Sequence, residues 1–225
     1  MEDKEENKGD CTANVKIDME PPSTPVIDNK YHDTWVNKNY TIKITSVDET
    51  SGIKQFEYRY PNSTREATDG KPENEWHVWE NSSKAPGDKT PFESTEFKRE
   101  RGEVLEVRAV DYAGNYSEVS TTIIKIDITS PSCSISASGK SGNSNWYISN
   151  VTVTLRTTDT GPAGISSYGL GTSSSVSYNN KKTGMQYETK ETTWHGIVKD
   201  AAGNTATCSS GTIKVDTTAP TISLN

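Results

Sequence analysis

Residues 111–115, Asp-Tyr-Ala-Gly-Asn, and residues 124–131, Ile-Lys-Ile-Asp-Ile-Thr-Ser-Pro, decide how this chain is organised. The same two motifs return as Asp-Ala-Ala-Gly-Asn at 200–204 and Ile-Lys-Val-Asp-Thr-Thr-Ala-Pro at 213–220. The second motif also stands near the start, as Val-Lys-Ile-Asp-Met-Glu-Pro-Pro at 15–22. Motifs that recur in a fixed order indicate a repeat architecture. We therefore expect each copy to form the end of one module and the linker into the next.

The composition favours small β-sheet domains and argues against two kinds of partner. A chain of 225 residues suits two domains of about 100 residues each. Only 30% of the residues are hydrophobic, and no helical stripe is visible, so thin sandwiches with one solvated face per sheet fit best. The net charge of -7 argues against nucleic acid as a partner. The lack of an apolar run of about 18 residues argues against membrane insertion of this segment.

Alternation of apolar and polar residues predicts several short strands in each repeat. In the first repeat it covers residues 40–45, 53–60, 104–110 and 116–127. The second repeat matches it closely, with Trp146 in the place of Trp35 and Asp159 in the place of Asp48. The first repeat carries about twenty more residues, between 61 and 101. Short strands with regular turns in units of this size predict an all-β fold of two tandem immunoglobulin-like β-sandwich domains.

The predicted boundaries follow the linker motifs. They are a lead-in with the last strand of a preceding repeat at 1–22, the first sandwich with its long insertion at 23–131, the second sandwich at 132–220, and the start of a third repeat at 221–225.

Trp-x-x-x-Asn occurs in both repeats, and it is followed in the same order by variants of three further motifs: Asp-x-x-Ser-Gly-Ile (48–53), Val-x-Asp-x-Ala-Gly-Asn (198–204) and Ile-Lys-Val-Asp-Thr-Thr-Ala-Pro (213–220). Together they resemble the tandem bacterial immunoglobulin-like repeats of large surface proteins and adhesins, over nearly the whole chain. The resemblance implies an extracellular or cell-surface setting and a structural role, as a stalk, a spacer or part of an adhesive surface. The implied partners are neighbouring repeats of the same chain, together with a host or matrix ligand that the sequence does not name.

The cysteines predict one disulfide bond. Cys133 and Cys208 lie in the second repeat, and the equivalent positions of the first repeat are Thr24 and Val119, so the two cysteines are absent together. Their joint presence favours a bond between them, which would stabilise the fold by roughly 3–5 kcal/mol and fits an oxidising compartment. Cys11 then lacks a partner in this chain. The alternative is three reduced thiols.

Six aspartates are candidates for metal ligands. In an immunoglobulin-like sandwich, the start of the first strand, the loop after the second strand and the loop before the last strand share one pole. This topology groups a linker aspartate with two loop aspartates, as Asp18 with Asp48 and Asp111, and as Asp127 with Asp159 and Asp200. Carboxylate, amide and carbonyl oxygens, including those of Asn115 or Asn204, suit a calcium ion. The resemblance supports calcium between domains, because some arrays of this kind are stiffened by calcium at their joints. The alternative is that these side chains cap their own turns, and that the chain needs no cofactor.

Trp76 and Trp79, in the insertion, suggest a second function. Exposed indoles beside Asn and Asp can stack on a sugar ring, which would make the first domain a carbohydrate- or protein-binding module. The alternative is that both rings cap the core of the sandwich.

No pattern of an active site is recognisable. His32, His77 and His195 are scattered, no His/Cys set has zinc spacing, and no nucleophile elbow or phosphate-binding loop occurs. We therefore predict a non-enzymatic structural repeat.

Overall fold

The computed structural model describes residues 14–97 and 101–223 of the chain. Within these ranges the chain forms fourteen β-strands and no helix, which confirms the predicted all-β class. The described residues accordingly contain no apolar helix of the length that crosses a membrane.

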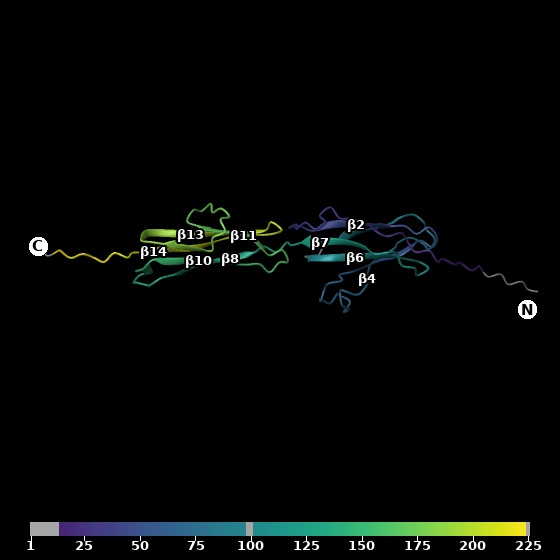
Figure 1. The fold of residues 1–225 in the computed structure, drawn as a ribbon, viewed down its shortest axis with the longest axis horizontal. Coiled ribbons are helices and arrows are strands. Elements are labelled where there is room, and N and C mark those ends of the chain that lie inside the picture. The colour runs from purple at the N-terminus through teal and green to yellow at the C-terminus, as the bar shows by residue number, and fades with distance from the viewer. Residues whose placement is uncertain (1–13, 98–100, 224–225) are drawn as a thin grey trace, which may run out of the picture. The chain divides into compact units, whose positions relative to one another are not determined.

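Strands β1–β7 form two sheets. They are β1 (Val26–Asp28), β2 (Tyr40–Ser46), β3 (Ile53–Arg59), β4 (His77–Asn81), β5 (Phe92–Phe97), β6 (Arg101–Asp111) and β7 (Ser120–Ile126). One sheet has the order β1-β2-β5 and the other the order β4-β3-β6-β7 (Figure 1). The predicted strands correspond to β2, β3, β6 and β7. Strands β4 and β5 lie in the polar insertion, where alternation predicts no strand.

The two sheets of β1–β7 pack through alternating apolar residues. In β2, Ile42 and Ile44 are fully buried while the residues between and before them are exposed, as the alternation predicts. In β3, which pairs antiparallel with β6, Phe56 lies opposite Ala109. The Phe56 ring stacks on Phe92 of β5, with 5.1 Å between ring centroids. Because β3 and β5 belong to different sheets, this stack joins the two layers of a sandwich.

Strands β8–β14 form a second pair of sheets. They are β8 (Ser132–Ser138), β9 (Trp146–Tyr147), β10 (Val151–Thr158), β11 (Ile165–Gly171), β12 (Thr183–Gln186), β13 (Thr189–Asp200) and β14 (Thr205–Val215). The sheet orders are β12-β10-β8 and β11-β13-β14-β9. In Figure 1, the β11-β13 side of one sheet lies over β10 and β8 of the other.

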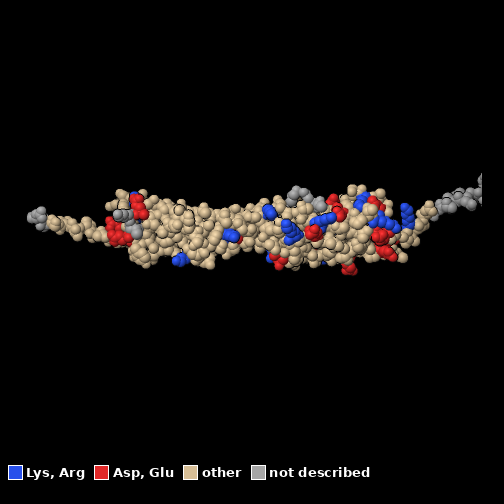
Figure 2. Space-filling model, turned by 90° about the horizontal axis from the view of Figure 1, so that it is seen from above, with Lys and Arg blue, Asp and Glu red and all other residues tan. Residues whose placement is uncertain are grey.

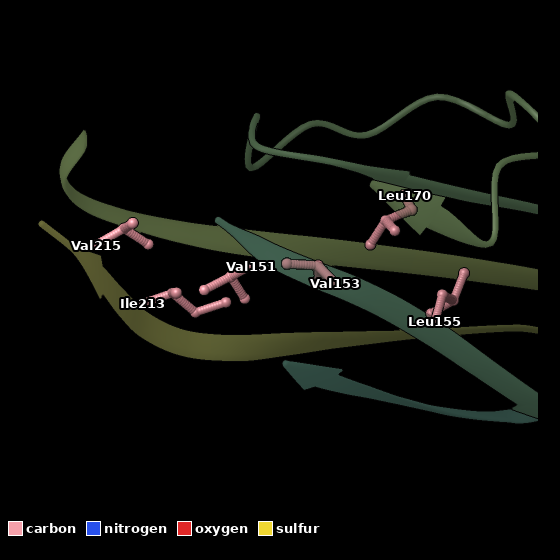
Figure 3. Packing of buried hydrophobic residues seen from close by; sticks show 6 residues of the cluster. All are labelled: Val151, Val153, Leu155, Leu170, Ile213 and Val215. Carbon is pink, nitrogen blue, oxygen red and sulfur yellow. The ribbon is translucent and has the colours of Figure 1, made fainter. Parts of the chain in front are cut away.

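The core of β8–β14 is a cluster of six buried aliphatic residues. They are Val151, Val153, Leu155, Leu170, Ile213 and Val215. Figure 3 shows these side chains, carried by β10 on one side and by β11 and β14 on the other, filling the space between the strands. Burying an aliphatic side chain of this size contributes about 1.5–3 kcal/mol, so this cluster is the main stabilising contact between the layers.

A disulfide bond joins the same two layers. Cys133 of β8 and Cys208 of β14 are bonded, with 5.8 Å between their Cα atoms and 75 residues between them in sequence. The predicted pairing is confirmed. Cys11 lies outside the described residues.

The end of each repeat is built in the same way. Val36 forms a parallel bridge with Ile126, and Tyr147 pairs in parallel with Val215. The linker aspartate directly follows the second residue of each pair, and its backbone amide donates to the carbonyl oxygen of the first residue. Asp127 donates to the Val36 carbonyl at 3.0 Å, and Asp216 donates to the Tyr147 carbonyl at 2.9 Å. The repeat seen in the sequence is therefore also a repeat of backbone hydrogen bonds.

Strand pairing and the density of residue contacts divide the chain into units in different ways. Those contacts define one compact unit of residues 1–28, 43–95 and 105–121, and another of residues 29–42, 96–104 and 122–225. That division cuts β2, β5, β6 and β7 internally. Strand pairing is the better guide, because hydrogen bonds hold each strand in one sheet, and the proposed domain boundaries rest on it and on the sequence motifs.

The lead-in differs from its prediction. Val15 and Ile17 carry the alternation of a last strand, but they lie outside any strand and are 76% and 70% exposed. An isolated apolar strand has no neighbour to pair with among the described residues, and so the alternation alone does not form one.

Charged side chains are unevenly distributed. On the face shown in Figure 2 they gather over β1–β7, whereas most of the surface over β8–β14 is uncharged. Both signs are interspersed over the first repeat, where Lys43 pairs with Glu93 and Arg108 with Glu57, each at 2.7 Å. This face therefore carries no extended patch of one sign.

Candidate metal centre

Asp111 and Asp200 shape the same turn in the two repeats. Each ends a long strand, β6 or β13, and each is completely buried. One carboxylate oxygen, Oδ1, accepts the amides of the third and fourth residues that follow. The donors are Gly114 (2.6 Å) and Asn115 (2.8 Å) for Asp111, and Gly203 (2.6 Å) and Asn204 (2.8 Å) for Asp200. The turn-capping alternative is therefore true of Oδ1, and Oδ2 accepts from the side-chain amide of the asparagine in the same turn.

The asparagine of each turn holds the preceding linker. The Asn204 Nδ2 group donates to the carbonyl oxygens of Asp127 and Thr129, at 2.9 and 3.3 Å, and to Asp200 Oδ2 at 2.6 Å. In the first repeat, Asn115 Nδ2 makes the equivalent bonds to the Asp18 carbonyl (3.3 Å), the Glu20 carbonyl (3.3 Å) and Asp111 Oδ2 (2.8 Å). All of these partners accept, so the amide nitrogen faces the aspartates. The side-chain nitrogen of each asparagine therefore holds both the linker and the buried aspartate of its own turn.

The linker aspartates make one local bond in common. Oδ1 of Asp127 accepts the amide of Thr129 at 2.9 Å, and Asp18 and Asp216 accept the amide two residues later at 3.1 and 2.9 Å. Asp127 makes a further bond, from the amide of Ala163 to Oδ2 at 2.8 Å. This bond ties the linker to the loop between β10 and β11.

The third aspartate of each set lies in the loop that follows β2 in the first repeat and β10 in the second. Asp48 Oδ1 accepts the amides of Thr50, Ser51 and Gly52, at 3.1, 2.7 and 2.6 Å. Asp159 Oδ1 accepts only the amide of Gly161, at 3.0 Å. Its other oxygen, Oδ2, is shielded from solvent and has no hydrogen-bond partner. A buried carboxylate oxygen without a partner is costly unless a cation or a proton satisfies it.

The structure brings both predicted sets together. In each set, Asp18 with Asp48 and Asp111, and Asp127 with Asp159 and Asp200, one carboxylate oxygen per residue lies within 4.8 Å of the others. We call these sets the first and the second carboxylate triad. Asp48, Asp111, Asp127 and Asp200 are buried, and Asp18 and Asp159 are partly exposed.

The triads concentrate negative charge without a basic partner. Two carboxylates about 4 Å apart repel each other by about 4 kcal/mol at an effective dielectric constant of 20. Among the described residues, no lysine, arginine or histidine forms an ion pair with any of the six aspartates. Burial raises the pKa of Asp127, and the charges of Asp159 and Asp200 raise it further. In the first triad, by contrast, hydrogen bonding by Ser51 lowers the pKa of Asp18.

A hard divalent cation fits this donor set. Calcium takes six to eight oxygen ligands in flexible geometry and prefers carboxylates and carbonyls, and each triad offers three carboxylates at adjacent positions. Magnesium demands a nearly ideal octahedron and gives up water reluctantly. An acidic, oxygen-only set on loops therefore suits calcium better.

Gly161, which lies against Asp127 of the second carboxylate triad, was not among the predicted site residues. A Cβ atom at Gly161 would lie 2.3 Å from Asp127 Oδ1, which no side chain tolerates. The first repeat has Thr50 two residues after Asp48, where the second has Gly161 two residues after Asp159. The Asp-x-Gly sequence is the only signal of this close approach.

Trp76 and Trp79 contact different neighbours. The Trp79 ring meets Tyr58 edge-on at 5.5 Å between centroids, and the Arg59 guanidinium lies 4.6 Å from the centre of Trp76. Tyr58 and Arg59 are successive residues of β3, whose side chains point to opposite faces of the sheet. The two indoles, each partly buried, therefore form no common platform on which a sugar ring could stack.

Trp76 belongs to a stack of charged and aromatic groups that sequence patterns do not reveal. The Arg108 guanidinium lies 4.2 Å from the centre of the Trp76 ring and 4.0 Å from that of Tyr116, and Arg108 also pairs with Glu57 at 2.7 Å. Cation–π contacts of this kind contribute about 0.5–2 kcal/mol each.

Comparison with known proteins adds little to this description. The chain matches no protein-family model and no curated protein. Among solved structures, it is similar to the fibronectin(III)-like modules of CbhA from Clostridium thermocellum, at 14% identity and a TM-score of 0.34. The similarity covers 85% of this chain and 94% of that one. A likeness at this level says nothing about function, and the all-β sandwich rests on the strand pairing described above.

Proposed function

We propose that this chain is a non-enzymatic structural segment of an extracellular repeat protein, a stalk or spacer whose carboxylate triads bind calcium. The observation that carries the proposal is the repetition of the triad. Twice, a linker aspartate meets two loop aspartates of the repeat that follows, within 4.8 Å. A motif needed only for its own turn has no reason to bring three carboxylates together.

Calcium would act by joining the linker to the loops. In the second triad, Asp127 belongs to the linker, Asp159 to the loop after β10 and Asp200 to the end of β13. An ion bound to all three would add a cross-link to the Asn204 and Ala163 bonds already holding the linker. Because a ligand that binds only the ordered state stabilises that state, calcium would restrict bending at the linker.

An extracellular setting is consistent with two features of the chain. The Cys133–Cys208 disulfide is typical of oxidising compartments. Calcium sites of extracellular modules have dissociation constants of about 10⁻⁴–10⁻³ M, a range that suits sites on partly exposed loops. Neighbouring repeats are the partners that a spacer of this kind requires, and an adhesive surface is the finer form of the same proposal.

Calorimetric titration of the calcium-free protein tests the metal sites. The wild type is expected to bind calcium at two sites. Asp159→Asn keeps an Oδ1 acceptor for Gly161 but removes the charge of the unpartnered oxygen, and is expected to abolish one site. Asp216→Asn is the matched control, since Asp216 makes the same local bond to the second residue after it but belongs to neither triad. No binding at millimolar calcium, or unchanged stoichiometry in Asp159→Asn, would overturn the proposal.

Small-angle X-ray scattering tests the spacer role separately. With calcium, the range of conformations that fits the scattering curve is expected to narrow in the wild type and in Asp216→Asn. In Asp159→Asn this narrowing is expected to be smaller. If calcium binds but the range of conformations stays the same, the ion affects only the loops that bind it, and the proposed stiffening role is wrong.

A further inference from the structure

Residues 66–72, in the insertion between β3 and β4, form a small hairpin. Glu66 and Pro72 make an isolated antiparallel bridge. Within the turn, the Ala67 amide donates to the Lys71 carbonyl at 2.8 Å, and the Gly70 amide donates to the Ala67 carbonyl at 3.0 Å. So short a hairpin is not stable by itself, and it needs contacts with the sheet to stay ordered.

His77, the first residue of β4, supplies two such contacts. Its side chain is buried, with a relative exposure of 4%. Nδ1 lies 2.9 Å from Asp69 Oδ2, at the tip of the hairpin, and Nε2 lies 2.9 Å from the Pro72 carbonyl oxygen, at its end. One imidazole ring therefore spans the hairpin and fastens it to the sheet.

The chemistry of the two partners determines the protonation of the ring. The Pro72 carbonyl oxygen can only accept a hydrogen bond, and an ionised carboxylate likewise only accepts. Asp69 is held in that form, because a hydrogen bond from the Lys71 amide and the bond to His77 lower its pKa. A neutral imidazole has one N–H donor and an imidazolium has two. Both contacts of His77 are satisfied only by the imidazolium.

The surroundings of His77 contain few other charges. From the hairpin, Asp69 faces it directly, and Lys71 lies close enough to act on Asp69. From β3, the Tyr58 ring packs against the imidazole at 5.6 Å between centroids. Glu73, which follows the hairpin, is buried and accepts a bond from the Ser63 hydroxyl at 2.8 Å.

We propose that His77 is a proton-operated clasp that holds the 66–72 hairpin on the sheet of the first repeat. When the ring is protonated, both bonds form and the hairpin is closed. When the ring loses a proton, one nitrogen presents a lone pair to an acceptor, and one bond is replaced by repulsion. A rise in pH that removes this proton therefore opens the hairpin, because only the imidazolium can donate to both acceptors.

Nuclear magnetic resonance of the full chain tests the clasp directly. At pH 5.5, both ring nitrogens of His77 are expected to carry protons that exchange slowly with water. Amide exchange of Ala67 and Gly70, corrected for its intrinsic pH dependence, is expected to be about tenfold faster at pH 8 than at pH 6, the factor that corresponds to one lost hydrogen bond. A single protonated nitrogen at pH 5.5, or equal protection at both pH values, overturns the proposal.

Three variants separate the clasp from general stability. His77→Gln is expected to leave the hairpin unprotected at both pH values. Asp69→Asn, an exposed and milder change, removes the ionised acceptor and is expected to move hairpin opening to lower pH, so the test holds even if His77→Gln fails to fold. His195→Gln, in the second repeat, is the control and is expected to keep the wild-type pH dependence. An unchanged pH dependence in Asp69→Asn would contradict the clasp.

Discussion

The side-chain amide of Asn204 lies 2.9 Å from the carbonyl oxygen of Asp127, 77 residues earlier in the chain. The last residue of a turn motif thus holds the linker that begins its own repeat. Asn115 makes the same contact with Asp18. The two recurring motifs, far apart in sequence, are therefore two sides of one structural joint.

Replacing Asn204 with Ala is expected to destabilise the second repeat by about 1–3 kcal/mol, because it leaves buried acceptors without a donor. Urea denaturation followed by tryptophan fluorescence measures the effect. Asn115→Ala is the comparison, and a smaller loss is expected there because its bond to the carbonyl of the linker aspartate is longer, at 3.3 Å instead of 2.9 Å. Equal losses would show that the hydrogen bonds to the linker carbonyls do not determine the loss of stability.

Calcium is expected to raise the free energy of unfolding. At 10 mM calcium, a site with a dissociation constant of about 1 mM contributes about 1.4 kcal/mol. Thermal unfolding with calcium and with a chelator measures the difference. Magnesium at the same concentration is the control and is expected to stabilise less, because its octahedral geometry is strict. Equal stabilisation by both ions would point to screening of charge instead of a built site.

Gly161→Ala is expected to damage the second triad. The new methyl group would lie 2.3 Å from Asp127 Oδ1, so the loop or the linker must move, at a cost of about 1–3 kcal/mol. Calorimetry should also show weaker calcium binding at one site. Gly171→Ala is the control, because its nearest neighbour would be Val176 at an ordinary 3.6 Å. Unchanged stability of Gly161→Ala would show that the loop has room for a side chain between residue 161 and Asp127.

Removing the disulfide is expected to destabilise the second repeat by about 2–5 kcal/mol. Replacing Cys133 and Cys208 together by Ala avoids an unpaired thiol, and chemical denaturation of the variant and the wild type measures the loss. Cys11→Ser is the control and is expected to unfold as the wild type does. If the double variant is equally stable, the bond contributes less than the closure of a long loop implies.

The fold was predictable because alternation and repetition are local properties of the sequence. Ile42 and Ile44 face the core because successive residues of a strand point to opposite sides. Strands β4 and β5 were not predicted in this way. The burial pattern of β4 is irregular, and pairing with β3 and with β2 holds β4 and β5 in their sheets. The roles of Gly161, His77 and Arg108 were also missed. Each depends on an atom from a distant part of the chain.

By itself, the sequence determined the period, the linkers, the paired cysteines and the six aspartates, since each of these can be read from residues compared across two copies. Tertiary structure alone decided what those residues contact. The motif spanning residues 111–115 predicts a turn, but only the folded chain shows that Asp111 meets Asp18 and Asp48 and that Asn115 turns its amide nitrogen toward the linker. The reason is physical: a turn is set by neighbours in sequence, whereas three carboxylates are brought together by the packing of sheets whose strands lie far apart in the chain.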